Sequence, residues 1–247
     1  MSGNPTPEPE PLAGIDRDLE RLRAGAVGLG RWSLGMVHDG WAAFDRGDVA
    51  LAQAVLDRDE RLDQLDQEIE HETIAFLVIR RPAAVALRTT VAVLKASTHL
   101  DRIGRLGFDI ARMTTGEAPQ GHPDVHALLQ SMDQVAESMV EDSLESLAHG
   151  QPELARGLFV RDDQMDQMHR QTMRLVVREL EQDPHSAPRL SSELMVARHF
   201  ERIADNACKI GEKTIYAITG QRRSEYLPRH PYAPYALERP DGSPPYR

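Results

Sequence analysis

The chain has 247 residues, of which 40% are apolar, 28% charged and only 5% aromatic, a composition that favours helices over strands in a soluble globular protein. Its formal net charge of −10 repels nucleic-acid phosphates, so we expect no nucleic-acid partner. The single cysteine, Cys208, cannot form an internal disulfide, and no segment has the pattern of a secretory signal or the apolar length of a membrane span. We therefore expect a cytoplasmic protein that reaches a membrane only through partners.

Helical periodicity and the positions of Gly and Pro define the expected elements. Residues 1–11 and 221–247 are rich in proline and are predicted to be disordered. Between them, the breakers separate six predicted helices at about 12–45, 49–80, 83–115, 124–149, 152–182 and 188–219. The first three helices form one expected unit over residues 12–116, and the last three form a second over residues 123–220.

The predicted helices carry apolar seams. In the first helix, apolar or small residues step by three and four from Ile15 and Leu19 to Ala43. In the last helix, the same spacing runs from Leu190 to Ile218. Long helices with such seams pack at small angles, so we predict an all-α protein built from antiparallel bundles.

An internal repeat relates the two units. Residues 36–66 match residues 139–169 at a constant offset of 103, so that Met36 corresponds to Met139. The third helices match at an offset of 100, where His99-Leu-Asp-Arg-Ile103 aligns with His199-Phe-Glu-Arg-Ile203. Self-similarity of this kind predicts two tandem, pseudo-symmetric three-helix bundles.

Carboxylate pairs spaced by four residues recur on these helices, which places both side chains of a pair on one face. The pairs are Asp59 with Asp63, Asp162 with Asp166, and Glu201 with Asp205. At the position of the last pair, the first repeat has Asp101 with Arg105, so that a base replaces the second acid.

These pairs are candidate metal ligands. Like charges at this spacing destabilise a helix by about 0.2–0.5 kcal/mol, so their recurrence indicates that a favourable interaction compensates for the repulsion. Carboxylates from adjacent helices suit Mg²⁺, Mn²⁺, Zn²⁺ or Fe, and bridging carboxylates can hold several ions. The predicted ligands are Asp162, Asp166, Glu201, Asp205, Asp59, Asp63 and Asp101. The open alternative is that these are rim residues bonded to Arg102, Arg202, Arg58 or Arg161.

Two His-containing spacings add a further candidate. Glu68-x-x-His71 and Asp166-x-x-His169 have the carboxylate-x-x-His spacing of ferritin-like di-iron bundles, although they do not correspond across the repeat. His169 could assist a metal cluster beside Asp166.

His99 and His199 do correspond across the repeat, and we expect them to form structural hydrogen bonds near the bundle surface. Cys208 is predicted to be a small core residue. The sequence shows neither a nucleophile–base–acid constellation nor a nucleotide fingerprint, and we predict a protein that is not an enzyme.

Three motifs resemble those of the PhoU family. The stretch Ala197-Arg-His-Phe-Glu-Arg-Ile-Ala-Asp-Asn-Ala207, followed by Lys-Ile-Gly-Glu and Ile-Tyr-Ala-Ile-Thr-Gly220, is similar to the signature of that family's second repeat. Arg161-Asp-Asp-Gln-Met-Asp166 resembles its helix-five motif, and Arg58-Asp-Glu-Arg-Leu-Asp63 resembles the first-repeat partner. The resemblance spans about residues 12–220.

The resemblance implies a fold, a role and partners. It implies two pseudo-symmetric three-helix bundles, with multinuclear iron or other metal clusters at the acidic motifs in some members. The implied role is negative regulation of the phosphate-starvation response, through a link between the ATPase subunit of the phosphate ABC transporter and a membrane sensor histidine kinase. We also expect a homodimer. The chain departs from the family pattern at Ala204, in place of a glycine, and at Arg105, in place of an acid, so the second-half acids carry over more directly.

Two other functions stay open at this point. One is a ferritin-like, carboxylate-bridged di-metal oxidase, which the two carboxylate-x-x-His spacings would support. The other is a plain helical dimerisation module, in which the acidic pairs bind neither metal nor partner.

Overall fold

A computed structural model describes residues 12–116, 122–222 and 225, and within these ranges the chain forms helices and no strands. The helices are α1 (Leu12–Arg46), α2 (Val49–Leu56), α3 (Asp59–Arg80), α4 (Ala84–Ala111), α5 (Pro123–His149), α6 (Pro152–Gln182), the 3₁₀ turn η1 (Pro184–Ser186) and α7 (Ala187–Thr219). The predicted all-α fold of two three-helix bundles is confirmed. The predictions for residues 1–11 and for most of 221–247 lie outside the described residues.

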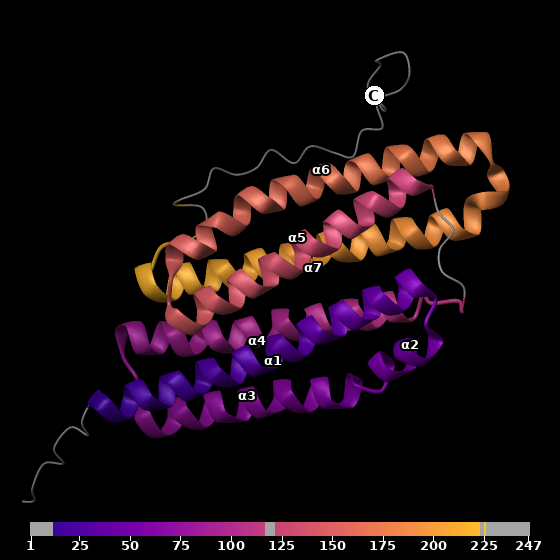
Figure 1. The fold of residues 1–247 in the computed structure, drawn as a ribbon. Coiled ribbons are helices and arrows are strands. Elements are labelled where there is room, and N and C mark those ends of the chain that lie inside the picture. The colour runs from indigo at the N-terminus through magenta and orange to yellow at the C-terminus, as the bar shows by residue number, and fades with distance from the viewer. Residues whose placement is uncertain (1–11, 117–121, 223–224, 226–247) are drawn as a thin grey trace, which may run out of the picture.

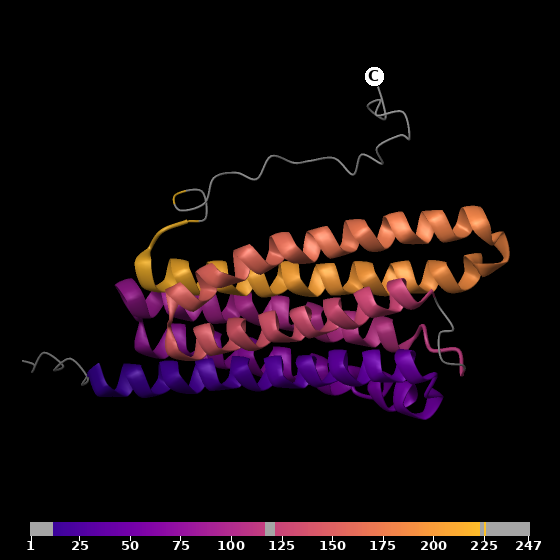
Figure 2. The same cartoon turned by 45° about the horizontal axis from the view of Figure 1, so that its top comes forward.

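Four long helices form the centre of the molecule. Helix α1 packs on α4, α4 packs on α7, α7 packs on α5, and α5 packs back on α1 (Figure 1). Helix α3 lies on the outer side of α1 and α4, and α6 lies on the outer side of α5 and α7. Turning the molecule shows the long helices running side by side, with the two halves joined through α4 with α7 and α1 with α5 (Figure 2).

The predicted helix over 49–80 is wrong in one respect, because it is two helices. Helix α2 ends at Leu56 and α3 begins at Asp59, with a two-residue turn between them. Asp57 closes α2, since its backbone N–H donates to Gln53 O over 3.0 Å and its Oδ1 accepts from Gln53 Nε2 over 2.8 Å. The next N–H, that of Arg58, donates to Val55 O over 3.1 Å, only three residues back, so the four-residue spacing of helical bonds ends at this turn. The equivalent position in α6 is Val160, and that helix continues unbroken.

The apolar seams form the core. Most apolar residues of the seams, from Leu19 to Ala43 in α1 and from Leu190 to Ile215 in α7, lie in one buried cluster that includes Cys208, as predicted. Where α1 crosses α4 the backbones touch, because a Cβ added to Gly40 would lie only 2.4 Å from Gly107 O. Glycine at both positions therefore permits the backbones of α1 and α4 to approach each other this closely.

Candidate functional site

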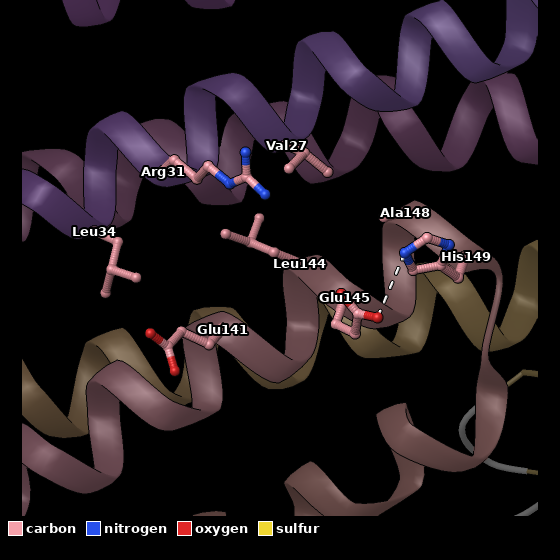
Figure 3. A pocket seen from close by; sticks show the side chains of 8 residues that line it. All are labelled: Val27, Arg31, Leu34, Glu141, Leu144, Glu145, Ala148 and His149. Carbon is pink, nitrogen blue, oxygen red and sulfur yellow. Dashed lines mark ion pairs between the residues drawn. The ribbon is translucent and has the colours of Figure 1, made fainter.

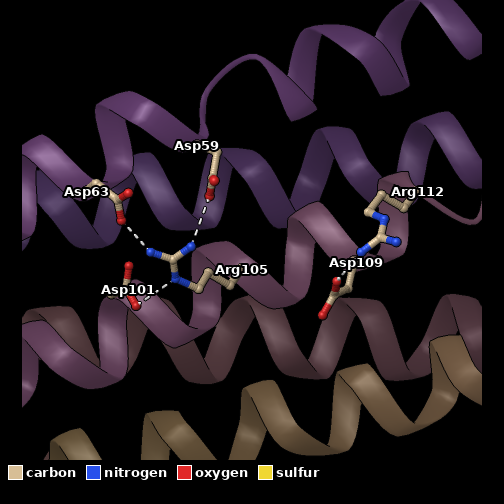
Figure 4. A network of polar contacts seen from close by, with 6 residues as sticks. All are labelled: Asp59, Asp63, Asp101, Arg105, Asp109 and Arg112. Carbon is tan, nitrogen blue, oxygen red and sulfur yellow. Dashed lines mark hydrogen bonds and ion pairs between the residues drawn. The ribbon is translucent and has the colours of Figure 1, made fainter.

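The acids of the first half surround a single guanidinium. Asp59 and Asp63 project from α3, Asp101 and Arg105 project from α4, and all three carboxylates point at Arg105 (Figure 4). Arg105 Nη1 lies 3.2 Å from Asp59 Oδ1, Nε lies 3.1 Å from Asp101 Oδ2, and Nη2 pairs with Asp63. The helices bring together the three acids that the sequence singled out.

One guanidinium is shared by three carboxylates in this cluster. Burial raises the pKa of Asp101, and the negative charges of Asp66 and Asp63 act in the same direction, while Arg105 opposes them. Burial alone would lower the pKa of Arg105, but the three carboxylates outweigh it and the net shift is upward. The guanidinium fills the position between the carboxylates that a cation would need, so these residues, as arranged, do not fit a metal.

The acids of the second half lie on α6 and α7 and have separate basic neighbours. Arg198 Nη1 lies 2.8 Å from Glu201 Oε2, and Lys209 Nζ pairs with Asp205 Oδ2. Asp166 Oδ2 lies 3.7 Å from Arg170 Nη1. Each of these cations comes from the same helix as its acid, three or four residues away, whereas Arg105 contacts acids on two helices.

Glu201 interacts electrostatically with other acids of this second cluster. Its side chain is 16% exposed. Burial raises the pKa of Glu201, and after the opposing charge of Arg198 the charges of Asp166 and Asp205 raise it further. The carboxylates of both helices are therefore within electrostatic reach of one another, and added positive charge would stabilise their ionised forms.

The arrangement falls short of a preformed metal site. Across residues 12–116 and 122–222, no three His, Cys, Asp or Glu side chains are gathered so that they could hold a metal ion. Ligation in the second half would require the ion pairs of Arg198 and Lys209 to open first. Metal binding by the predicted acids stays a prediction.

Two of the four arginines named as alternative partners of the acids, Arg58 and Arg161, pair with other carboxylates. Arg58 pairs with Asp39 over 2.6 Å, and Arg161 pairs with Asp142 at the equivalent place in the second half. The repeat could have revealed these partners, because both members of each pair are offset by 103 residues.

Histidines occupy different environments in the two halves. His99 Nδ1 lies 3.0 Å from Asn206 Oδ1, a bond between α4 and α7 of the kind expected. His199 is 5% exposed, and within the described residues neither ring nitrogen has a hydrogen-bond partner. The offset of 100 explains the difference. By this offset Leu106 corresponds to Asn206, and leucine offers His199 no hydrogen-bonding group. Burial also lowers the pKa of His199.

Sequence reasoning missed a polar cluster between the halves. Asp133 on α5 is 8% exposed, and its Oδ1 has no hydrogen-bond partner within the described residues. Nearby, His38 Nδ1 lies 2.9 Å from Glu137 Oε1, which joins α1 to α5. Burial raises the pKa of Asp133 to about 7, and the charges of Glu137 and Asp45 act in the same direction while His38 opposes them. The sequence signal that could have revealed this cluster is the acidic residue Asp133 among the buried apolar positions of α5.

A groove of about 290 Å³ runs between α1 and α5 (Figure 3). Leu144 projects into it, and the charged side chains of Arg31, Glu141, Glu145 and His149 lie around it. His149 Nε2 pairs with Glu145 Oε1 over 3.4 Å. The groove has mixed charge, and none of the predicted metal ligands lines it. In the described part of the chain, no helix is both long and apolar enough to cross a membrane.

Two stacked three-helix units, with acidic pairs at equivalent places, define an all-α repeat protein whose candidate sites lie on helix faces. The chain belongs to the PhoU family, because the PhoU domain model matches residues 27–114 and 129–214, one match in each half.

Named relatives and a solved structure agree with this assignment. A Pseudomonas putida protein named phosphate-specific transport system accessory protein PhoU homolog is 32% identical over 83% of this chain and 81% of its own length. A Caulobacter vibrioides protein of the same name is 30% identical over 86% of this chain and 93% of its own. The crystal structure of PhoU from Pseudomonas aeruginosa superposes with a TM-score of 0.78 at 27% identity, covering 84% of this chain and all of that one.

Proposed function

We propose that this chain is a non-enzymatic accessory regulator of phosphate uptake, which keeps the phosphate-starvation response off when phosphate is plentiful. The observation that carries the proposal is family membership over both repeats, together with relatives named as accessory proteins of the phosphate-specific transport system. We place the protein in the cytoplasm, as a homodimer that acts by binding its partners.

The partners in this proposal are the ATPase subunit of the phosphate ABC transporter and a sensor histidine kinase. Partly exposed carboxylates at equivalent places on α3 with α4 and on α6 with α7 would present negative charge to basic partner surfaces. The three acids of the first cluster share Arg105, whereas Asp166, Glu201 and Asp205 of the second cluster each pair with a separate cation on their own helix.

The deciding experiment is an alkaline phosphatase reporter in phosphate-rich medium, with the gene deleted and then restored. Constitutive expression on deletion, reversed by the intact gene, is the expected result. Unchanged repression in a strain that also lacks any second family member would contradict the proposed function.

A double variant then tests the acidic surface. Glu201→Ala with Asp205→Ala should impair repression while the helices stay folded, as monitored by circular dichroism. The matched control is Asp59→Ala with Asp63→Ala in the first cluster, where both carboxylates already contact Arg105, and it should impair repression less. A folded second-half variant that represses normally would remove these acids from the proposal.

We further propose that Asp162, Asp166, Glu201 and Asp205 bind divalent metal or iron when their ion pairs open. Support comes from the partly buried carboxyl of Glu201, whose pKa the charges of Asp166 and Asp205 raise, and from the exposure of the cations that would have to move. Oxygen ligands of this kind suit hard cations. Mass spectrometry measures the metal content of the protein. Thermal unfolding with and without Mn²⁺ or Fe²⁺ measures how much the metal raises its Tm.

The metal test has an internal control in the repeat. Glu201→Gln with Asp205→Asn should abolish any metal-dependent rise in Tm, whereas Asp59→Asn with Asp63→Asn should leave it unchanged. An equal loss in both variants, or no metal uptake by the intact chain, would refute the second-half site.

The geometry does not favour the alternative function of a ferritin-like di-metal oxidase. Glu68 is 58% exposed and pairs with Arg61 over 2.9 Å, and His71 is also exposed on α3. Ferritin-like di-metal sites use carboxylate and His side chains that project into the bundle core. Of the two carboxylate-x-x-His spacings, only Asp166 with the buried His169 has its His inside the bundle.

A further inference from the structure

The last two turns of α3 expose apolar side chains. Ile74, Val78 and Ile79 are 49%, 68% and 72% exposed. Helix α3 packs on α1 and α4 through residues such as Thr73 and Phe76, which leaves its outer face uncovered by the described residues. Contiguous exposed apolar side chains on a soluble protein mark an interaction surface more often than an accident of composition.

The second repeat shows that the fold does not require this apolar face. The positions equivalent to Val78 and Ile79 are Glu181 and Gln182 at the end of α6, the corresponding outer helix. Ile74 corresponds to Val177, which is 39% exposed, so the two halves differ at two of these three positions. The difference points to a contact that only the first half makes.

The apolar character continues across the turn into α4. Val85 and Leu87 in its first turn are 48% and 42% exposed. Together with Ile74, Val78 and Ile79 they form what we call the α3–α4 apolar surface. All five lie within about two helical turns of the short connection at residues 81–83.

The end of α7 lies beside this surface. Arg88, one residue beyond Leu87, donates from Nε to Ala217 O over 3.2 Å in the last turn of α7. Gly220, which caps α7, also lies against the Arg88 guanidinium. The chain after residue 220 therefore leaves the bundle next to the beginning of α4.

The segment that follows has the composition of an apolar ligand. Residues 226–247 lie outside the described residues, and they contain four of the chain's five tyrosines. The stretch 226–237 reads Tyr-Leu-Pro-Arg-His-Pro-Tyr-Ala-Pro-Tyr-Ala-Leu. Tyrosine and leucine supply large apolar area, and proline lowers the entropy lost on ordering. Five residues separate Gly220 from Tyr226, and the six Cα–Cα steps between them can span about 20 Å, enough to reach from Arg88 to the α3–α4 turn.

We propose that residues 226–237 dock on the α3–α4 apolar surface of the same chain. Tethering beside the surface gives the segment a high effective concentration, so a contact too weak to hold two separate molecules can still be occupied. A second copy is the poorer occupant, because stable protein interfaces use about 20–30 residues on each side, whereas this surface offers five exposed apolar side chains.

Photo-crosslinking in the full-length chain tests the proposal. Tyr232 or Tyr235 is replaced by p-benzoylphenylalanine, and mass spectrometry maps the cross-links after irradiation. We expect cross-links within one chain to peptides that cover residues 72–88. Val78→Lys should lower their yield about tenfold, since an ammonium group at an apolar contact is costly to bury. The matched control is Val160→Lys, which alters a valine that is 64% exposed on α6 and should leave the yield unchanged.

Each other outcome overturns the proposal. Cross-links between differently labelled chains would show that a second copy receives the segment. Cross-links to other helices, cross-links that Val78→Lys leaves undiminished, or the absence of cross-links at both positions would show that the surface does not hold it. Circular dichroism checks that both lysine variants are folded, which their exposed positions favour.

Discussion

Arg58 Nη2 lies 2.6 Å from Asp39 Oδ2, and the same pair recurs in the second half as Arg161 with Asp142. The first pair ties α1 to the start of α3, and the second ties α5 to α6. Arg58 and Asp39 are each about 30% exposed, so neither charge is fully hydrated. A repeated, partly buried ion pair between the same two helices of each bundle fixes how the outer helix sits on its neighbour.

Removing the arginine should therefore destabilise either half. Arg58→Met or Arg161→Met is expected to lower the free energy of unfolding by about 1–2 kcal/mol, because an aspartate is left without its partner in a partly buried position. Urea denaturation measures the loss. Arg61→Met is the control, since its pair with Glu68 is more exposed and is worth less than about 1 kcal/mol. Equal effects of all three variants would mean that burial of the pair contributes nothing.

The fold was largely predictable because both repeats carry the same apolar seams, and two copies of one pattern are harder to misread than one. The break at Asp57 was not, because neither Gly nor Pro marks it. The Arg105 cluster could be expected, since register alone places that base opposite the acids. The ion pairs of the second half depend on side-chain conformations, which spacing does not determine.

Close backbone contact between α1 and α4 predicts a strong effect of a single methyl group. Gly40→Ala should destabilise the protein by about 3 kcal/mol, because the new Cβ would lie 2.4 Å from a carbonyl oxygen of α4 and the helices would have to separate. Gly28→Ala is the control on the same helix, where an added Cβ meets nothing within 4 Å. It should stabilise by about 0.5–1 kcal/mol through helix propensity. Thermal and urea unfolding should give these opposite signs, and a harmless Gly40→Ala would mean that the crossing is looser than described.

The end of α3 uses an arginine where glycine would be less strained. Arg81 caps the helix with φ 46° and ψ 54°, whereas Gly220 takes the left-handed conformation after α7. Left-handed backbone costs a non-glycine residue about 1–2 kcal/mol, and part of that is offset by the greater unfolded-state entropy of glycine. Arg81→Gly should therefore raise the free energy of unfolding by about 1 kcal/mol, and the reciprocal Gly220→Ala should lower it. Destabilisation by Arg81→Gly would indicate a contribution of its side chain that outweighs the strain.

The buried carboxyl of Asp133 should make stability depend on pH. Its pKa of about 7 in the folded protein exceeds the value near 4 of an unfolded aspartate, because burial and the charges of Glu137 and Asp45 outweigh that of His38. Between pH 4 and 7 the native state holds the extra proton, so stability falls as pH rises through this window, and the cost is fully present above pH 7. Replacing the carboxyl by a neutral group removes the cost.

Asp133→Asn should therefore stabilise the protein by about 1–3 kcal/mol at pH 8 and by much less at pH 5, as measured by urea unfolding at both values. Glu70→Gln, at an exposed position on α3, is the control and should change neither value appreciably. If Asp133→Asn were instead destabilising at pH 8, the ionised carboxylate would have to gain more from His38 than it loses through burial. The contact of α1 with α5 would then depend on that attraction, and His38→Ala should destabilise the protein to a similar extent.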